Sequence, residues 1–465
     1  MESTTLGPRD DGGYRHVLRI ALPMVLSTSS ATIMAFVDRM FLGWYSSDAM
    51  AAALVGGMTT WAATSTFVGI SSYTSTFVAQ YFGAGQKPRI AVVVWQGVFF
   101  AMAAGACLAV AGQNADHILA LTRHPPEVLS GEITFFRILM YGGVFGVLSP
   151  ALSGFYGGLG RTRVMMVVET SGNVLNIVLD YLLIFGNFGL PELGIKGAAI
   201  ATVSAGGVIC LSYTALILFG PLGREYRVLR VPRIEWGLLY RLLRFGFPNG
   251  LGWTVDAAGW TAFVWLVGRL GDLQAQALSA TFAINQIAFL PMMGFSGATA
   301  ILVGQFIGAG RAGLAERATR TAFAITFSYM ALAAALFVLI PGPLVRLLSP
   351  RANPGEFAAV VAMATVLLRL VALYSLFDGG NIIFAAALRG AGDTKFVLFM
   401  MAALSLALLI APTYLAVQVF RFGIYHAMVI ATIYVIVLAM SYYVRFRAGR
   451  WKSMKVIEER AGGAD

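Results

Sequence analysis

The strongest constraint on this chain is a series of long apolar runs that contain very few charged residues. Twelve of them are long enough to form a helix of about 20 residues, the length that crosses a bilayer core of about 30 Å. Because the runs are continuous, they predict membrane-spanning helices rather than the alternating strands of a barrel. Their approximate bounds are 17–44, 50–80, 89–112, 131–156, 164–186, 194–219, 240–268, 275–305, 317–341, 358–387, 394–418 and 423–446.

The composition agrees with an all-α polytopic membrane protein. Of the 465 residues, 58% are hydrophobic and 12% are charged, and the mean hydropathy is +0.76. An average soluble domain carries about 25% charged residues, so a soluble enzyme, a disordered chain and a nucleic-acid binder are all disfavoured. Cys107 and Cys210 lie within apolar runs, which argues against a structural disulfide and a Cys/His metal site. No resident cofactor is expected.

The basic residues predict the orientation of the chain in the membrane. With the N-terminus inside, 24 of the 33 Lys and Arg fall on inside segments and 6 on outside loops. Cytoplasmic loops of membrane proteins carry such an excess, so both termini are predicted to be cytoplasmic in a multi-pass protein of the inner (plasma) membrane. The net charge of +11 then needs no nucleic-acid partner, and the lipid bilayer is the expected surrounding.

The chain also contains an internal repeat. Pro23 and Pro248 occupy equivalent places in their runs, 225 residues apart. Two further motifs recur: Gln80–Gly85 as Gln305–Gly310 at the same offset, and Gly158–Thr162 as Gly390–Thr394 at an offset of 232. Six spans per half predict parallel repeats related by an axis along the membrane normal. The predicted divisions are an N-lobe (1–220), a cytoplasmic linker (221–240), a C-lobe (241–450) and a cytoplasmic tail (451–465).

Five acids lie inside the predicted spans, where each costs about 2.5–3.5 kcal/mol unless it faces an interior or a water-filled cavity. They are Asp38, Glu169, Asp180, Asp256 and Asp378. Helical spacing places several of them on polar stripes: Glu169, Asn173, Asn176 and Asp180; Asn249, Trp253, Asp256 and Trp260; and Tyr374, Asp378 and Asn381. Carboxylate, amide and hydroxyl groups are suited to hold a proton or a hard cation such as Na⁺.

Other roles for these residues stay open at this point. Asp38 is either a coupling group or the structural partner of a buried arginine, for which Arg137 or Arg369 would be needed because Arg39 points about 100° away on a helix. Trp253 and Trp260 are either substrate contacts or packing residues. The candidate substrate-cleft residues are Asn173, Trp253, Trp260, Tyr374 and Asn381.

In the order of its motifs the chain resembles the multidrug and toxic compound extrusion (MATE) transporters from end to end. The stretches that carry the resemblance are Pro23 to Gly43, Val78–Gly85, Val303–Gly310, Asn176–Gly186, Gly197–Thr202 and Leu388–Thr394. The resemblance implies twelve helices in two six-helix lobes around a V-shaped cleft. It also implies an N-lobe cluster for H⁺ or Na⁺ at Asp38, Asn176, Asp180 and Thr202, and a C-lobe acidic pair at Asp256 and Asp378. The chain combines features of the NorM-like and DinF-like branches, and it has Asp256 where the NorM-like branch usually has Glu.

The predicted function is therefore a secondary-active multidrug efflux antiporter and not an enzyme. It would export amphipathic organic cations in exchange for H⁺ or Na⁺ by alternating access, working as a monomer. One alternative is a flippase for lipid-linked precursors, whose cleft should be rich in cations, whereas the in-span charges here are mostly acids. The other is an intramembrane enzyme, which would need a metal cluster or an activated nucleophile.

Overall fold

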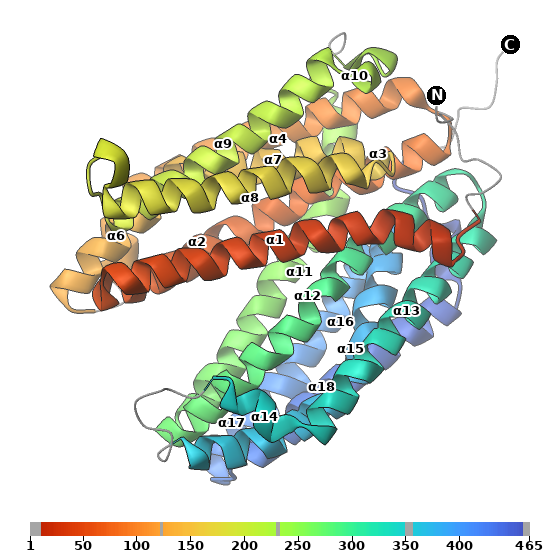
Figure 1. The fold of residues 1–465 in the computed structure, drawn as a ribbon. Coiled ribbons are helices and arrows are strands. Elements are labelled where there is room, and N and C mark those ends of the chain that lie inside the picture. Colours follow the sequence, from red (N-terminus) through yellow and green to blue (C-terminus); the bar gives the residue numbers. More distant parts are fainter. Residues whose placement is uncertain (1–10, 121–123, 229–232, 349–356, 459–465) are drawn as a thin grey trace, which may run out of the picture.

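The computed structural model describes residues 11–120, 124–228, 233–348 and 357–458, which form helices and connecting segments without strands (Figure 1). The first group of helices, called the N-lobe below, comprises α1 (Tyr14–Tyr45), α2 (Ser47–Ser72), α3 (Thr74–Gly83), α4 (Lys87–Gln113), α5 (Ala115–Leu119), α6 (Pro126–Tyr141), α7 (Gly143–Gly158), α8 (Thr162–Phe185), the 3-10 turn η2 (Asn187–Gly189), α9 (Ile195–Phe219) and α10 (Pro221–Glu225). The second group, the C-lobe, comprises α11 (Trp236–Gly268), α12 (Asp272–Gly308), α13 (Ala312–Leu339), α14 (Pro341–Arg346), α15 (Ala358–Ala391), α16 (Thr394–Leu404), the π-helical η4 (Ser405–Ile410), α17 (Ala411–Tyr414), the π-helical η5 (Leu415–Val419), α18 (Ile424–Arg447) and the 3-10 turn η6 (Arg450–Ser453).

The predicted all-α membrane fold is confirmed, and each predicted run coincides with one helix or a succession of helices. Within the described residues, nine helices are long and apolar enough to cross a membrane, and a tenth span results if α6 and α7, bent by 41°, are counted together. The other two runs form α2 with α3, and α11. These pack against each other between the lobes, where Thr254 bonds to both Ser65 and Thr66 at 2.8 Å. Their polar contact faces lower their hydropathy, so length and composition alone do not establish the number twelve.

The two lobes diverge from one end of the molecule, as the ribbon shows (Figure 1). We call this the closed end; α1 begins there, and the two repeated Gln–Gly motifs meet there. Each lobe's first helix starts in the core of the other lobe. Val17 and Ile20 of α1 belong to the hydrophobic cluster of the C-lobe, and Leu238 and Leu242 of α11 belong to that of the N-lobe. The lobes are therefore interlocked at the closed end and free to diverge at the other, the open end.

The repeated motifs owe their small residues to a close approach of the lobes. A Cβ built on Gly83, at the end of α3, would lie 1.9 Å from the carbonyl oxygen of Gln305. A Cβ on Gly308, at the end of α12, would lie 2.1 Å from the carbonyl oxygen of Gln80. Only glycine permits this separation at either position, so the two copies of the motif contact each other reciprocally.

The glutamines of the same motifs join the lobes by hydrogen bonds. Gln80 Nε2 donates to the carbonyl oxygen of Gly390 at 3.0 Å, and Gln305 Nε2 donates to that of Gly158 at 2.8 Å. Gly158 and Gly390 are themselves equivalent in the second repeated motif. Both repeats seen in the sequence therefore form the seam at the closed end.

The domain boundaries stay a prediction. Residues 1–10, 229–232 and 459–465 of the predicted N-lobe, linker and tail lie outside the described residues. Within the predicted linker, α10 ends at Glu225 and α11 begins at Trp236. The predicted linker therefore includes the first turn of α11.

Candidate functional site

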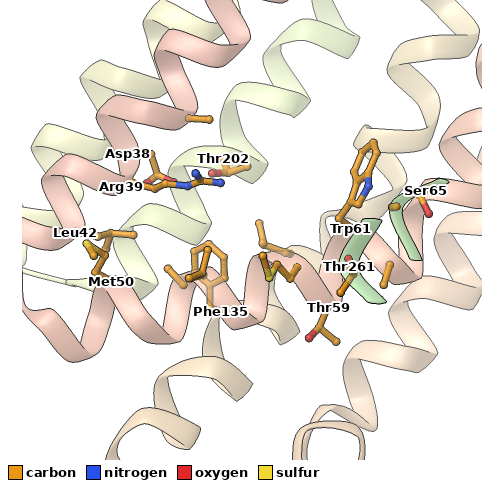
Figure 2. A pocket seen from close by; sticks show the side chains of 18 of the residues that line it. Asp38, Arg39, Leu42, Met50, Thr59, Trp61, Ser65, Phe135, Thr202 and Thr261 are labelled. Atoms are coloured by element: carbon orange, nitrogen blue, oxygen red, sulfur yellow. The ribbon is translucent and has the colours of Figure 1, made fainter. Parts of the chain in front are cut away.

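A pocket of about 1010 Å³ lies between the lobes toward the open end. Its walls come from α1, α2, α6 and α9 of the N-lobe and from α11 of the C-lobe. Figure 2 shows Asp38, Arg39 and Thr202 at one end of the pocket and Trp61, Ser65 and Thr261 at the other. Among the described residues, the charged lining consists of Asp38 and Arg39. Methionines and tryptophans form much of the remaining wall: Met34, Met50, Met58, Trp61 and Trp265.

The four residues of the predicted N-lobe cluster come from three neighbouring helices. Asp38 lies on α1, Asn176 and Asp180 on α8, and Thr202 on α9. With its amide nitrogen oriented toward Asp180, Asn176 donates to Asp180 Oδ2 at 3.0 Å and accepts from the backbone N–H of Thr202 at 3.1 Å. The structure thus brings these residues together directly behind the pocket wall that Asp38 and Thr202 form.

The carboxylates of this cluster are short of hydrogen-bond partners. Asp180 is 0% exposed, and its carboxyl group interacts electrostatically with the negative charge of Asp38. Within the described residues, Asp38 Oδ1 and Asp180 Oδ1 are buried without a partner. A buried, unpartnered carboxylate oxygen is costly. A proton or a Na⁺ ion bound by these carboxylates would supply the missing interactions, so the donor set fits either ion.

The positively charged side chain that interacts electrostatically with Asp38 is its neighbour Arg39, which lines the same pocket. Arg137, one of the partners considered from the sequence, instead forms an ion pair with Asp116. Arg369, the other one, is an exposed residue of α15. Among the described residues no ion pair joins Arg39 to Asp38, so Arg39 influences Asp38 through its charge alone.

The two predicted C-lobe acids face the interior of their own lobe. Asp378 on α15 is 9% exposed and accepts a hydrogen bond from Asn381 at 3.2 Å, and the charge of Asp256 on α11 acts on it. Tyr374, one turn before Asp378, accepts from Asn285 of α12 at 3.2 Å. These residues form a second polar cluster inside the C-lobe, separate from the lining of the pocket.

The candidate substrate-cleft residues occupy other places. Asn173 donates to Ser30 at 2.8 Å, between α8 and α1. Trp260 packs in the C-lobe against aromatic rings of α11, α12 and α18. Trp253 stacks on Trp61 of the N-lobe at a centroid distance of 6.2 Å. The lining described for the pocket includes none of the five candidates Asn173, Trp253, Trp260, Tyr374 and Asn381, so their contact with substrate stays a prediction.

The sequence argument missed the face of α11 that lines the pocket. That face carries Thr254, Ala257, Ala258, Thr261, Ala262 and Trp265, at steps of three and four residues. The predicted stripe beside it is divided: Asp256 and Trp260 are turned into the C-lobe, whereas Asn249 and Trp253 contact α2 of the N-lobe. The sequence signal for this face is a series of small and hydroxyl residues at helical spacing that ends in Trp265. A search limited to charged residues does not detect it.

Comparison with known proteins agrees with this architecture. The MatE family model matches residues 23–182 and 259–415, one segment in each lobe. The "Probable multidrug resistance protein NorM" of Pseudomonas aeruginosa is 30% identical, over 82% of this chain and 78% of its own length. The multidrug resistance protein MdtK of Edwardsiella ictaluri is 28% identical, over 83% of this chain and 84% of its own length.

Solved structures share the fold. An outward-facing multidrug resistance MATE family transporter matches with a TM-score of 0.85 and 21% identity, covering 97% of this chain and 100% of that one. A transporter of the MOP superfamily from Pyrococcus furiosus, reported with a reversed polarity of its binding pocket, matches with a TM-score of 0.85 and 20% identity over 98% of this chain and 99% of that one. The fold alone therefore does not determine the substrate.

Proposed function

The chain belongs to the MatE family of multidrug efflux transporters, and on this premise we propose that it is a secondary-active antiporter that exports organic cations in exchange for H⁺ or Na⁺. The observation that carries the proposal is the pocket between the lobes, with Asp38 in its wall and Asp180 buried behind that wall, each with a carboxylate oxygen that has no partner among the described residues. The inner (plasma) membrane is the proposed location, and both termini are proposed to be cytoplasmic.

The lining of the pocket favours varied, flat and apolar substrates. Its volume of about 1010 Å³ lies at the upper end of the range for small-molecule sites. Methionine side chains adapt to different shapes, and a tryptophan face attracts a cation as well as an aromatic ring. One face of Trp61 stacks on Trp253, but the residue is still 46% exposed, so part of its ring is accessible to a planar cation.

Coupling follows from competition for one negative charge. An ionised Asp38 attracts a cationic substrate to the pocket. When H⁺ or Na⁺ neutralises the cluster of Asp38, Asn176, Asp180 and Thr202, that attraction is lost and the substrate is released. Each charge that moves inward across the membrane supplies about 2.3 kcal/mol per 100 mV. The same carboxylate thus holds either the ion or the substrate, which is the requirement for exchange.

The orientation gives the direction of transport. If the closed end faces the cytoplasm, as the basic residues predict, the pocket opens to the outside in this conformation. An ion from outside then reaches Asp38 while the substrate leaves. Rocking of the lobes would next close the open end, separate the closed end and expose the pocket to the cytoplasm.

The test uses purified protein in liposomes loaded with ethidium, with a pH gradient or a Na⁺ gradient imposed separately. We expect one gradient to drive ethidium efflux, and Asp38→Asn and Asp180→Asn to abolish it. Asp48→Asn, which changes an exposed acid at the start of α2, is the control and should keep full transport.

The same assay locates the coupling site and can reject the proposal. Loss of efflux in Asp378→Asn, with full activity in Asp38→Asn, would move coupling to the C-lobe pair of Asp256 and Asp378. Absence of ethidium flux under either gradient, in protein that is folded and inserted, would contradict export of organic cations.

A further inference from the structure

Residues 450–458, called the strap below, follow α18 and cross the closed end from one lobe to the other. The strap begins in the C-lobe. Trp451 is fully buried, its ring stacks on Phe446 of α18 at a centroid distance of 4.9 Å, and its Nε1 donates to the carbonyl oxygen of Phe446 at 2.8 Å. Lys452 pairs with Glu316 of α13. The first half of the strap therefore moves with the C-lobe.

The second half of the strap is built into the N-lobe. Val456 and Ile457 are 0% and 5% exposed and belong to the N-lobe hydrophobic cluster. The backbone N–H of Val456 donates to Gln80 Oε1 of α3 at 2.9 Å. Gln80 Nε2 also donates to the carbonyl oxygen of Gly390 in the C-lobe, so this buried amide joins α3 both to the strap and to the C-lobe. Separation of the lobes would leave the amide to be satisfied by water.

Glu458 adds a set of charged contacts at the same place. Tyr81 of α3 donates its hydroxyl to Glu458 Oε2 at 2.7 Å. Arg89 of α4 contacts Glu458 Oε1 at 3.0 Å, and Arg241 of α11 contacts it at 2.6 Å. Burial tends to raise the pKa of Glu458, but the hydrogen bond from Tyr81 and the charges of the two arginines outweigh it and hold the pKa below its ordinary value. Glu458 is therefore ionised at neutral pH and keeps all three contacts.

The corresponding segment after α9 behaves differently. Its described residues on either side of 229–232 contact their own lobe, where Trp95 of α4 donates to the carbonyl oxygen of Val228 at 2.8 Å and Gln96 donates to that of Arg233 at 2.9 Å. The strap thus adds a connection between the lobes beyond those made by the two repeats.

We propose that the strap is a latch that holds the lobes together at the closed end and sets the ratio of outward-facing to inward-facing protein. The proposal rests on the alternating-access cycle proposed above. In that cycle the contacts of Val456 and Glu458 with α3 and α4 break each time the closed end opens. Weakening them shifts the equilibrium toward the conformation that is open at this end.

The experiment measures the distance between spin labels at the closed ends of the two lobes. Arg163 on α8 and Lys395 on α16 are exposed and equivalent in the repeat, so cysteines there carry the labels after Cys107 and Cys210 are changed to serine. In lipid nanodiscs, Glu458→Gln and Tyr81→Phe are each expected to raise the ratio of long to short distances about five- to tenfold. Both substitutions keep the shape of the side chain, and folding is checked by size-exclusion chromatography.

Lys452→Gln is the matched control, because it removes a charged contact of the strap that lies within the C-lobe. Its distance distribution should equal that of the parent. An unchanged ratio in both Glu458→Gln and Tyr81→Phe would overturn the proposal, and so would an equal shift in Lys452→Gln. The measurement reads lobe positions without added substrate, so it separates a failed latch from a failed assignment of transport.

Discussion

Replacement of Gly83 or Gly308 by alanine should open the closed end by steric conflict. The new Cβ would lie 1.9 Å from the carbonyl oxygen of Gln305 in one case and 2.1 Å from that of Gln80 in the other, against 3.4 Å for an ordinary contact. The helices must therefore separate by roughly 1.5 Å, and overpacking of this kind costs about 1–3 kcal/mol. Because only the conformation closed at this end bears the cost, its population relative to the open one should fall about five- to 150-fold.

The spin-label pair at Arg163 and Lys395 measures this shift directly. Gly83→Ala and Gly308→Ala should lengthen the distance to a similar extent, since the two positions are equivalent in the repeat. Gly237→Ala is the control, because no atom of the described residues lies within 4 Å of a Cβ at that position of α11. If folded Gly83→Ala and Gly308→Ala protein gave the distance distribution of the parent, the close approach would not determine the closed state and the reasoning would be refuted.

Three further predictions follow from the structure. Trp61→Ala should raise the Kd for ethidium, measured by fluorescence titration, about tenfold through loss of stacking and cation–π attraction. Trp260→Ala should leave that Kd unchanged and lower the free energy of unfolding, measured by thermal unfolding, by about 3 kcal/mol. Asp393 and Arg445 form an ion pair of 2.7 Å and are 7% and 19% exposed. Neutralising either residue alone should lower the free energy of unfolding by about 3 kcal/mol, and neutralising both should lower it by less than the sum of the two single effects, as measured by chemical unfolding. The pKa of Glu458 is lowered from the ordinary value of 4.5, so its contacts should be complete above pH 4.5 and lost as the pH falls through the lowered value. The distance between the spin labels should therefore be constant from pH 8 to about 5, and an increase already at pH 6 would contradict this.

The polar stripes show how far the sequence leads toward the site. Asn176 and Asp180 were placed on one face of a helix from their spacing, and the structure brings them next to Asp38 and Thr202. On α11 the same reasoning selected Trp260, which packs inside the C-lobe. Spacing reports which residues share a face of a helix, but it does not report what that face contacts.

The sequence by itself determined that the chain forms apolar helices in two related halves, because hydropathy and repeated motifs are local properties that the bilayer and the helical period act on directly. It also identified the glycine and glutamine motifs, but not that they contact each other. Only the tertiary structure decided which acids border the pocket, that Arg39 and Trp61 share it with Asp38, and that Glu458 lies against Tyr81 and Arg89, more than 360 residues away in the chain. These contacts depend on how the helices rotate and cross, and that is set by the packing of all of them together.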